Sequence, residues 1–413
     1  MTSDSTFVIV GGGLAGAKLA EALRQNDFDG DIVLCCGEEH LPYERPPLSK
    51  EHMTGTKRLA DFTPFDADWY RDNRIDVRPG TVIGGIDLAA HTVALPDDST
   101  LRYDKLALAT GSRPRRLSLP GAQAAGVHHL RTIDQSDALI GVLSAGTRLV
   151  VVGGGWIGLE VASSARQLGA EVAVLEAAAQ PLLGALGAEM GAVFADVHRE
   201  HGVDLRLGTE ISSITVEDGR ANGVVLADGS TLAADYVLVA VGAVADIEIA
   251  QAAGLDVGDG GVLVDASLAA SDPDVVAVGD IAAQDHPLLG ARVRVEHWAN
   301  ALNQPAVAAR TMLGLAAAYD RTPYFFTDQY DLGMEYRGFV PRTGYDAVIV
   351  RGDTGGAREF LTFWLDADDV VLAAMNVNVW DAGADLDSLV RDPSPVSRTR
   401  LADPAVPLSD VRA

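Results

Sequence analysis

The stretch "VVVGGGWIGLE" at residues 150–160 decides the fold, because it repeats the similar stretch "VIVGGGLAGAK" at residues 8–18. The glycines of the first copy are Gly11, Gly13 and Gly16. They follow the apolar run Phe7–Val10 and precede a segment whose apolar residues fall on one helical face. The pattern predicts a strand, a glycine turn and a helix, followed by a buried strand in "GDIVLCCGEE" that leads to the acid Glu38.

The second copy repeats each part. A strand at 148–152 precedes Gly153, Gly155 and Gly158, and a helix and the strand "EVAVLE" then lead to Glu176. In such a turn the first glycine permits a tight bend, the second lets the backbone approach a pyrophosphate, and the third lets helix and strand pack closely. The helix N-terminus holds the phosphates, and the trailing acid binds a ribose hydroxyl. One copy could be a packing turn alone, but two copies with trailing acids predict two dinucleotide sites.

The composition limits the class of protein. A chain of 413 residues has room for two or three domains, and 48% hydrophobic against 22% charged residues excludes a disordered chain. The net charge of −26 argues against a general nucleic-acid binder and against an anionic-membrane partner. No apolar run approaches the roughly 20 residues that span a bilayer, and no signal sequence opens the chain. We therefore expect a cytoplasmic protein, and the nine histidines show no metal-ligand spacing.

The two cysteines, Cys35 and Cys36, are adjacent in a predicted buried strand. Side chains alternate across a strand, so these thiols should point to opposite faces and are poorly placed as a redox couple. Disulfide reductases with paired nucleotide folds pass electrons through such a couple. Electrons must therefore leave this protein by another route.

The order of the segments predicts an α/β fold with two Rossmann-like dinucleotide-binding domains, one inserted in the other, and a C-terminal α+β domain with an antiparallel sheet. The first domain is discontinuous and comprises residues 1–113 and 244–319; it includes the strand "DVVAVGDIA" and a helix at about 298–315. The inserted domain comprises residues 114–243. The third comprises residues 320–413, where "REFLTFWLDADDVVLAAMNVNV" predicts two strands joined by a turn at 366–369. Its last 30 residues have no periodicity and predict a loosely packed tail.

Further motifs make the comparison with known proteins specific. They are "HLPYERPPLSK", "LALATGSRPR", "HLRTIDQSDAL", "VAVGDIA", "EHWANALNQ" and "FFTDQYDL". With the two glycine turns, in this order, they make nearly the whole chain resemble the FAD-dependent NADH:ferredoxin reductases of bacterial oxygenase systems, the family of the putidaredoxin and rubredoxin reductases. The resemblance implies FAD and NADH as cofactors. It also implies an iron–sulfur ferredoxin as the one-electron acceptor, which feeds an oxygenase such as a cytochrome P450.

The resemblance also implies roles for individual residues. The first glycine turn holds the ADP half of FAD, and the residues implied around this cofactor are Ala15 at the turn, Arg131 beside the pyrophosphate, Lys50 near the flavin N5, Val82 near the adenine, Asp280 on the ribityl chain and Trp298 along the isoalloxazine. The second turn binds NADH, with Glu160 near the meeting point of nicotinamide and flavin and Glu176 on the adenosine ribose. Further cofactor contacts are expected at Gly37, Glu38, Arg45, Ile157 and Gly242.

Physical chemistry supports several of these roles and leaves alternatives open. A cation at Lys50 would stabilise negative charge on a reduced flavin and Glu160 would fix its position, although the two could instead form a structural ion pair or be separate surface charges. Asp280 could cap a following helix, and Trp298 could be a core residue. Glu176 favours NADH over NADPH, because an acid binds a 2′-hydroxyl and repels a 2′-phosphate.

The FAD ribose contact stays open for a different reason. Family members often carry an acid near the end of the second strand, at the position where this chain has Gly37. The chain reads "CCGEE" here, so its first acid is Glu38. Either Glu38 or the Gly37 backbone could make the contact.

Other enzymes share the two nucleotide folds. NADH oxidases and peroxidases commonly use one redox cysteine after the first domain's second strand, where this chain has Tyr43–Leu48. A rubredoxin or small-molecule reductase stays open, and a non-enzymatic flavoprotein like apoptosis-inducing factor would need a basic surface. The oligomeric state is also open.

Basic residues gather at three places in the sequence. They are Arg113, Arg115 and Arg116; Arg292 and Arg294; and Arg310. Because the predicted helix that carries Arg310 begins at Trp298, we expect an acidic ferredoxin to dock near Arg310, against the alternative that these arginines are ordinary solvated charges.

Overall fold

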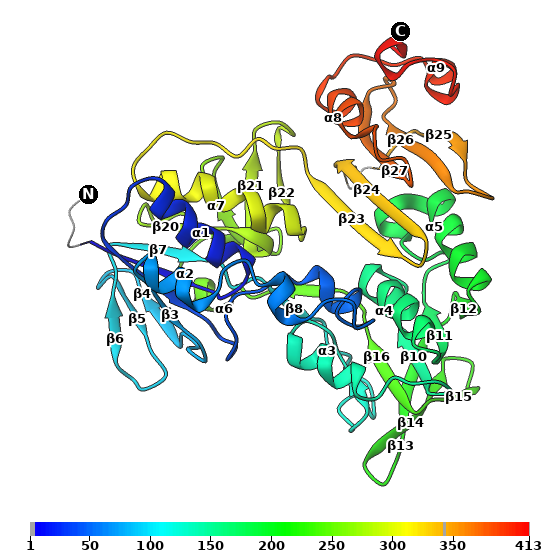
Figure 1. Cartoon of the computed structure of the whole chain (residues 1–413), viewed down its shortest axis with the longest axis horizontal. Helices are drawn as coiled ribbons and strands as arrows, with labels where there is room; N and C mark the ends of the chain where they lie inside the picture. The colour runs from blue at the N-terminus through cyan, green and yellow to red at the C-terminus, as the bar shows by residue number, and fades with distance from the viewer. Residues whose placement is uncertain (1–4, 342–343, 413) are drawn as a thin grey trace. The chain divides into compact units, whose positions relative to one another are not determined.

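The structure is a computed structural model that describes residues 5–341 and 344–412 (Figure 1). The chain forms two compact units. Unit 1 comprises residues 1–44, 59–113 and 244–325, and unit 2 comprises residues 45–58, 114–243 and 326–413. Each unit contains one of the two glycine turns. The predicted α/β fold with a C-terminal antiparallel sheet is confirmed, whereas the three domain boundaries stay a prediction.

Unit 1 is built on a parallel sheet with the strand order β20-β7-β1-β2-β3. Its central strand β1 (Thr6–Val10) is apolar and buried, as a strand covered on both faces must be. Helix α1 (Leu14–Gln25) follows β1 and packs against α7 (Trp298–Met312), which lies beside it in Figure 1. The chain order reverses between β1 and β7, and ligands of open α/β sheets bind at the carboxyl ends of the strands at such a point.

Smaller elements complete unit 1. The remaining strands of the parallel sheet are β2 (Asp31–Cys35), β3 (Ile75–Arg78), β7 (Lys105–Leu108) and β20 (Val275–Ala277). Two smaller sheets hold β4 (Gly85–Asp87), β5 (Thr92–Ala94) and β6 (Thr100–Arg102), and β18 (Val257–Gly258), β19 (Gly261–Val264), β21 (Ala282–His286) and β22 (Ala291–Arg294). The short helical segments are η2 (Leu59–Phe62), α2 (Ala67–Asp72), α6 (Glu248–Ala252) and η3 (Gly279–Ile281). Strands β8 (Ser112–Pro114) and β17 (Ala243–Ala245), on the two connecting segments, pair with each other.

Unit 2 repeats the same plan in a second parallel sheet, with the strand order β12-β11-β10-β16-β9. Strand β10 (Arg148–Val152) leads into the second glycine turn, and α4 (Trp156–Gln167) packs on β10 and β11 (Glu171–Glu176). Its other elements are η1 (Pro46–Ser49), β9 (Val127–His128), α3 (Ile133–Ile140), α5 (Leu183–Glu200), β12 (Asp204–Leu207), β13 (Ile211–Glu217), β14 (Arg220–Leu226), β15 (Thr231–Ala233) and β16 (Tyr236–Val239).

The C-terminal segment forms an antiparallel sheet in the order β23-β24-β27-β26-β25. The predicted hairpin is confirmed: β26 (Glu359–Leu365) and β27 (Val371–Val377) pair across a turn in which Asp366 accepts hydrogen bonds from the backbone N–H groups of Asp368 and Val370. The other strands are β23 (Tyr324–Gln329), β24 (Leu332–Gly338) and β25 (Ala347–Asp353).

The prediction of a loosely packed tail is wrong. The final residues form α8 (Gly383–Arg391), α9 (Arg398–Ala402) and η4 (Leu408–Asp410), and Leu401 and Val411 are fully buried in the core of this segment. The guanidinium of Arg351 on β25 donates to the carbonyl oxygens of Asp403 and Val406 at 2.8 and 2.7 Å. These contacts join residues some 50 positions apart in the chain, so no local sequence pattern predicts them.

Among residues 5–341 and 344–412, none of the helices has the length and apolar character needed to cross a membrane.

Candidate functional site

The first glycine turn fits a bound dinucleotide. A Cβ added at Gly11 would lie 2.1 Å from the carbonyl oxygen of Ala109, and one added at Gly16 would lie 2.1 Å from the carbonyl oxygen of Gly11. A Cβ at Gly13 would meet no atom within 4 Å. Gly11 and Gly16 are therefore required by packing inside the fold, whereas Gly13 borders open space, as expected where a pyrophosphate approaches the backbone.

The second turn has the same geometry in unit 2. A Cβ at Gly153 would lie 2.4 Å from the carbonyl oxygen of Ala240, one at Gly158 would lie 2.1 Å from that of Gly153, and one at Gly155 would meet nothing within 4 Å. The middle glycines Gly13 and Gly155 are the N-cap residues of α1 and α4, and neither helix has a side-chain cap or an acid in its first turn. Their first N–H groups therefore lack a capping side chain, which suits phosphate binding.

Glu176 is the last residue of β11, and its carboxylate is held by backbone N–H groups of the second glycine turn and of the segment that follows β11. The N–H of Gly154 donates to Oε2 at 2.6 Å, and the N–H of Ala178 donates to Oε1 at 2.7 Å. At the start of α4, 43% of the Ile157 side chain is exposed. A carboxylate held by two backbone N–H groups fits the predicted contact with a ribose, and an exposed apolar residue at the start of α4 fits a further contact with the nucleotide.

The acid of the first turn is held differently. The N–H of Gly11 bonds to the carbonyl of Cys35 as that of Gly153 bonds to the carbonyl of Leu175, so Cys36 occupies the position that corresponds to Glu176. Glu38 comes two residues later, and its Oε2 accepts a short hydrogen bond from the hydroxyl of Tyr43. Close by, Val82 is 62% exposed and lies 3.7 Å from the point where a Cβ on Gly37 would be. This exposed valine fits the predicted contact with an adenine.

Asp280 and Trp298 also belong to unit 1. The hydroxyl of Ser112 donates to Asp280 Oδ2 at 2.8 Å, and the indole Nε1 of Trp298 donates to Glu44 Oε2 at 2.8 Å. The alternative that Asp280 caps a following helix is wrong, because Asp280 lies inside the single turn η3 and the chain continues directly into β21. Trp298 is half-buried at the first position of α7 rather than a core residue.

Lys50 and Glu160 meet in unit 2 as a buried ion pair. Lys50 Nζ lies 3.2 Å from Glu160 Oε1, and the two residues are 8% and 3% exposed. Glu160 also accepts from the Ser49 hydroxyl at 2.5 Å and from the Thr327 hydroxyl at 2.6 Å. The alternative of two separate surface charges is therefore wrong. A buried carboxylate needs this many donors, because an uncompensated charge in the interior is very costly.

Arg45 and Arg131 are neighbours in unit 2, since Arg45 Nη1 donates to the carbonyl oxygen of Arg131 at 2.5 Å. Gly242 has φ +97°, and a Cβ there would meet nothing within 4 Å. Its carbonyl accepts from the N–H of Arg115. A positive φ with open space on one side explains why this position carries glycine.

The comparison with known proteins is decided by the match of residues 5–304 to the family described as pyridine nucleotide-disulphide oxidoreductase. The chain belongs to this family. Residues 324–412 also match the family described as reductase C-terminal. This pyridine nucleotide-disulphide oxidoreductase thus matches a known family over both glycine turns and over its C-terminal segment. The predicted resemblance to ferredoxin reductases is confirmed by the relatives that bear this name.

Within this family, the chain is similar to proteins named as ferredoxin or putidaredoxin reductases. The chain is 40% identical to the ferredoxin–NAD(+) reductase component of an anthranilate 1,2-dioxygenase system from Burkholderia cepacia, over 98% of this chain and 99% of that protein. It is 35% identical to putidaredoxin reductase from Pseudomonas putida, over 100% of this chain and 98% of that protein.

Two solved structures are similar over the full length. The covalent putidaredoxin reductase–putidaredoxin complex gives a TM-score of 0.93 at 34% identity and covers 99% of this chain and 98% of that one. The ferredoxin reductase for the CYP199A2 system from Rhodopseudomonas palustris also gives 0.93 at 34% identity and covers 99% and 100%.

The cysteines of this oxidoreductase are not suited to redox catalysis. Cys35 and Cys36 are both free and 1% exposed. Burial raises the pKa of the Cys35 thiol to about 11 and that of the Cys36 thiol to about 12. Because the thiolate is the reactive form, both side chains are inert near neutral pH. Residues 5–341 and 344–412 contain no cluster of three His, Cys, Asp or Glu residues that could hold a metal ion.

Three residues of the site escaped the sequence reasoning. Ser49 and Thr327 bind the Glu160 carboxylate, and Tyr43 binds Glu38. All three lie inside the motifs "HLPYERPPLSK" and "FFTDQYDL", so the motifs were the available signal. The residue types alone suggested no partner, because Thr327 is 167 positions from Glu160.

Proposed function

We propose that this protein is an FAD-dependent NADH:ferredoxin reductase that supplies electrons to an oxygenase such as a cytochrome P450. As a member of its family it is an oxidoreductase that uses FAD and NAD(H). The observation that carries the proposal is the pair of nucleotide turns, each with an open middle glycine, in a chain whose only two cysteines are buried and unreactive. The relatives named as ferredoxin reductases support the choice of acceptor.

The residues divide the work between the two turns. The turn of unit 1 binds FAD through Gly11, Gly13, Ala15 and Gly16, with Glu38, Val82, Asp280 and Trp298 as further contacts. The turn of unit 2 binds NADH through Gly153, Gly155, Ile157 and Gly158, and Glu176 receives the ribose. Bound FAD supplies the ability to accept a hydride from a nicotinamide and to release the two electrons singly. The protein's contribution is to bind, orient and exclude water.

Lys50 and Glu160 are the residues that we assign to the reacting end of the cofactors. The ammonium group of Lys50 is buried, lies 5.4 Å above the Phe326 ring and is held by Glu160. A fixed cation of this kind stabilises negative charge that develops on a reduced cofactor. Gly37, Arg45, Arg131 and Gly242 complete the set of proposed cofactor contacts.

Stopped-flow mixing with NADH and then with ferredoxin tests the function. We expect the wild type to bleach its flavin rapidly with NADH, to react slowly with oxygen, and to pass electrons to ferredoxin. Lys50→Met should slow flavin reduction at least about tenfold with normal FAD content, since it removes a charge-assisted interaction. Lys57→Met is the matched control, because Lys57 lies in the same segment and pairs with Glu51 at the surface. A protein that does not take up FAD, or that reduces oxygen faster than any ferredoxin, would contradict the proposal.

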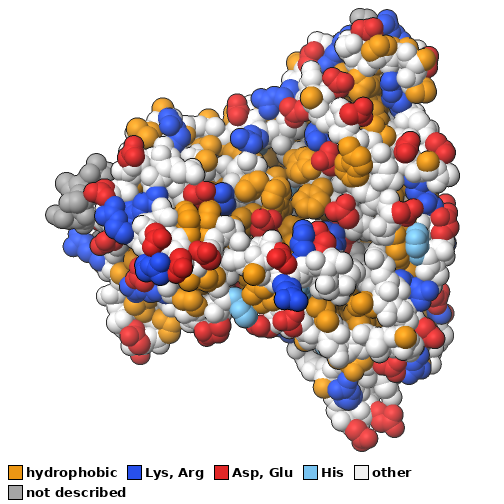
Figure 2. Space-filling view, viewed as in Figure 1, with side chains coloured by type: hydrophobic (Ala, Val, Ile, Leu, Met, Phe, Trp, Pro, Cys, Tyr) orange, Lys and Arg blue, Asp and Glu red, His pale blue; other side chains and the backbone are white. Residues whose placement is uncertain are grey.

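The docking site of the ferredoxin is part of the proposal. Arg292 and Arg294 are ion-paired with Asp285 and Glu296, whereas exposed Arg310 contacts a backbone carbonyl, that of Ala316. On the face seen in Figure 2, Lys and Arg side chains lie among Asp and Glu rather than apart from them. We therefore assign the contact with an acidic ferredoxin to the surface around Arg310.

Charge reversal at this surface tests the assignment. Arg310→Glu should raise the KM for ferredoxin and change its salt dependence, and should leave NADH-dependent ferricyanide reduction unchanged. Arg102→Glu makes the same charge change at an exposed position of β6 and serves as the control. An equal effect of the two variants would place the docking surface elsewhere.

We assign the protein to the cytoplasm, where NADH is produced, and cell fractionation checks this.

A further inference from the structure

A chain of hydrogen bonds runs from the buried ion pair of unit 2 through three further side chains. Thr327 Oγ1 lies 2.6 Å from Glu160 Oε1, and Gln329 Nε2 lies 3.2 Å from Thr327 Oγ1. Gln329 Oε1 lies 2.9 Å from His198 Nε2. Thr327 and Gln329 belong to β23 and His198 to α5, so the chain links the antiparallel sheet to the helices of the parallel sheet.

Every member of this chain is buried. Thr327 and His198 are 0% exposed, Gln329 is 1% exposed and Glu160 is 3% exposed. Water is therefore not the usual partner of these groups, and each must find its hydrogen bonds among the others. Because unsatisfied groups are costly in such a site, the direction of each bond is constrained by its neighbours.

The donor and acceptor of each hydrogen bond in this chain follow from the negative charge on Glu160. Glu160 pairs with Lys50 as a carboxylate, which can only accept hydrogen bonds, so Thr327 must donate its hydroxyl proton to Glu160. The Thr327 oxygen then accepts from the NH₂ group of Gln329, and the Gln329 carbonyl oxygen faces His198. His198 must therefore carry its proton on Nε2. Burial lowers the pKa of His198 to about 4, which agrees with a neutral ring that has one proton.

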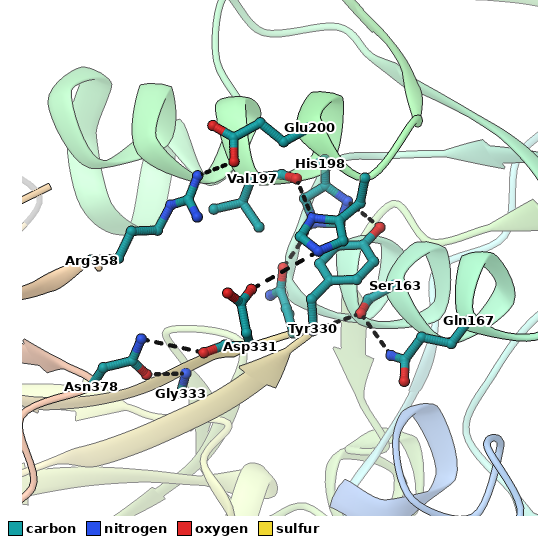
Figure 3. Close-up of polar contacts among 12 residues, drawn as sticks. Ser163, Gln167, Val197, His198, Glu200, Tyr330, Asp331, Gly333, Arg358 and Asn378 are labelled. Carbon is teal, nitrogen blue, oxygen red and sulfur yellow. Dashed lines mark hydrogen bonds and ion pairs between the residues drawn. The ribbon is translucent and has the colours of Figure 1, made fainter. Parts of the chain in front are cut away.

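The outer end of the chain is fastened to α4 and α5, as Figure 3 shows. Tyr330, which directly follows β23, has φ +56°, an uncommon backbone conformation for a bulky residue. Its N–H donates to Ser163 Oγ at 2.9 Å, and its ring stacks on His201 with 3.7 Å between the centroids. The Tyr330 hydroxyl lies 3.4 Å from His198 Nδ1, the nitrogen left as acceptor. These contacts hold the turn where Gln329 can reach His198.

We propose that Thr327, Gln329 and His198 are positioning residues that form a one-way hydrogen-bond chain ending on the Glu160 carboxylate. All donors point toward Glu160, so the chain fixes which oxygen faces Lys50. In the reverse arrangement Glu160 would donate to Thr327, and the Gln329 amide would be turned over so that its NH₂ group donates to His198 Nε2. The His198 proton would then sit on Nδ1. The tautomer of His198 therefore reports the direction of the hydrogen bond between Thr327 and Glu160, two side chains away.

The tautomer can be measured in the full-length protein with ¹⁵N-labelled histidine by NMR, with the His198 signals assigned by their loss in His198→Gln. We expect the wild type to show the Nε2–H form between pH 6 and 8. Thr327→Val keeps the shape of the side chain and removes both the donor to Glu160 and the acceptor for Gln329. The ratio of the Nε2–H to the Nδ1–H form should fall at least about fivefold, the effect of one net hydrogen bond.

Two control variants separate the chain from general packing. Thr327→Ser retains the hydroxyl and should restore the wild-type tautomer ratio. Thr362→Val removes the hydroxyl of another fully buried threonine, which bonds to Met190 Sδ and has no part in the chain. An Nδ1–H form in the wild type, or equal His198 spectra in Thr327→Val and Thr362→Val, would overturn the proposal.

The role of the chain in catalysis rests on the proposed function and has its own measurement. Single-turnover flavin reduction by saturating NADH should slow about tenfold in Thr327→Val, with the apparent Kd for NADH within about twofold of wild type. Thr327→Ser and Thr362→Val should retain the wild-type rate. If Thr327→Val changes the His198 tautomer ratio but not the rate of flavin reduction, the hydrogen-bond chain exists but has no role in catalysis. The assignment of Glu160 to the reacting end of the cofactors is then wrong.

Discussion

The two glycine turns of this protein are alike in backbone geometry and differ in how their acids are held. In both, the first and third glycines are required by contacts with backbone carbonyl oxygens, and the middle glycine borders open space. Glu176 ends its strand, and two backbone N–H groups bind its carboxylate, one from the glycine turn and one from the segment after β11. In unit 1 the corresponding position holds the buried thiol of Cys36, and the carboxylate of Glu38 accepts a hydrogen bond from the side-chain hydroxyl of Tyr43.

This difference fits the tasks that we propose for the two turns. A substrate such as NADH must bind and leave in every cycle, so its ribose acid benefits from being fixed before the nucleotide arrives. A cofactor that stays bound can form its contacts once, with a side chain from a neighbouring segment. The backbone geometry is therefore common to both sites, and the support of the acid distinguishes them.

The largest expected effect tests what the turns share. Gly11→Ala and Gly153→Ala should each destabilise the protein by about 3 kcal/mol or more, because the new Cβ would overlap a carbonyl oxygen at a positive φ. Gly13→Ala and Gly155→Ala should change stability by less than about 1 kcal/mol and still weaken nucleotide binding. Urea unfolding and FAD content measure the two effects. If Gly13→Ala were as destabilising as Gly11→Ala, Gly13 would be a packing residue and the similarity of the turns would not concern ligands.

The second prediction separates the acids. Glu176→Ala should reduce the preference for NADH over NADPH at least about tenfold, because it removes both a charge-assisted hydrogen bond and a repulsion of the 2′-phosphate. The ratio of kcat/KM for the two nucleotides measures this. Glu38→Ala should leave that ratio unchanged and weaken FAD binding instead. Equal kcat/KM values for NADH and NADPH in the wild type would refute the role of Glu176.

A smaller effect is expected from Tyr43→Phe, which removes only the hydroxyl that binds Glu38. The Kd for FAD should rise about fivefold, the usual effect of one hydrogen bond. Fluorescence titration of the apoprotein measures the Kd, and Tyr103→Phe serves as a control because Tyr103 is another buried tyrosine of unit 1, with its ring beside His91. Glu176 offers no such test, since its donors are backbone groups. An unchanged Kd in Tyr43→Phe would mean that Glu38 does not rely on Tyr43.

The smallest effect concerns Cys36, the residue that replaces the acid in unit 1. Burial raises its pKa from 9.0 to about 12, so its contribution to stability is complete below pH 9 and is lost as the pH rises toward 12. At pH 8 both thiols should resist iodoacetamide in the folded protein and react in urea, and treatment of the folded protein should leave turnover unchanged. Mass spectrometry measures the labelling. Rapid alkylation at pH 8 with loss of activity would reopen a redox role for the cysteines.

The sequence predicted those parts of the molecule that are specified locally. The two turns, their flanking strands and the hairpin at Asp366 each depend on residues within a short window, where periodicity and glycine positions are informative. The acid Glu176 was predicted for the same reason, because it ends a strand that starts from a recognisable turn. These features needed no knowledge of distant contacts.

The remaining parts depend on contacts between distant segments. Thr327 acquires its role only because β23 passes Glu160, and Tyr43 only because its segment folds back on Glu38. The tail was predicted to be loose because its helices are too short to show periodicity, yet Arg351 binds it through backbone carbonyl groups. Backbone acceptors have no residue type, so no sequence pattern reveals such an attachment.

The order of the strands in unit 1 has a consequence for the synthesis of the protein. Strand β20 pairs with β7 in the finished sheet, but residues 109–274 must be translated between them. At about 5–20 residues per second the ribosome needs roughly 10–30 s for this stretch. During that time β7 has an unpaired edge that can associate with other nascent chains. The cell must therefore protect a growing chain that cannot complete the parallel sheet of unit 1 until about two thirds of the protein has been made.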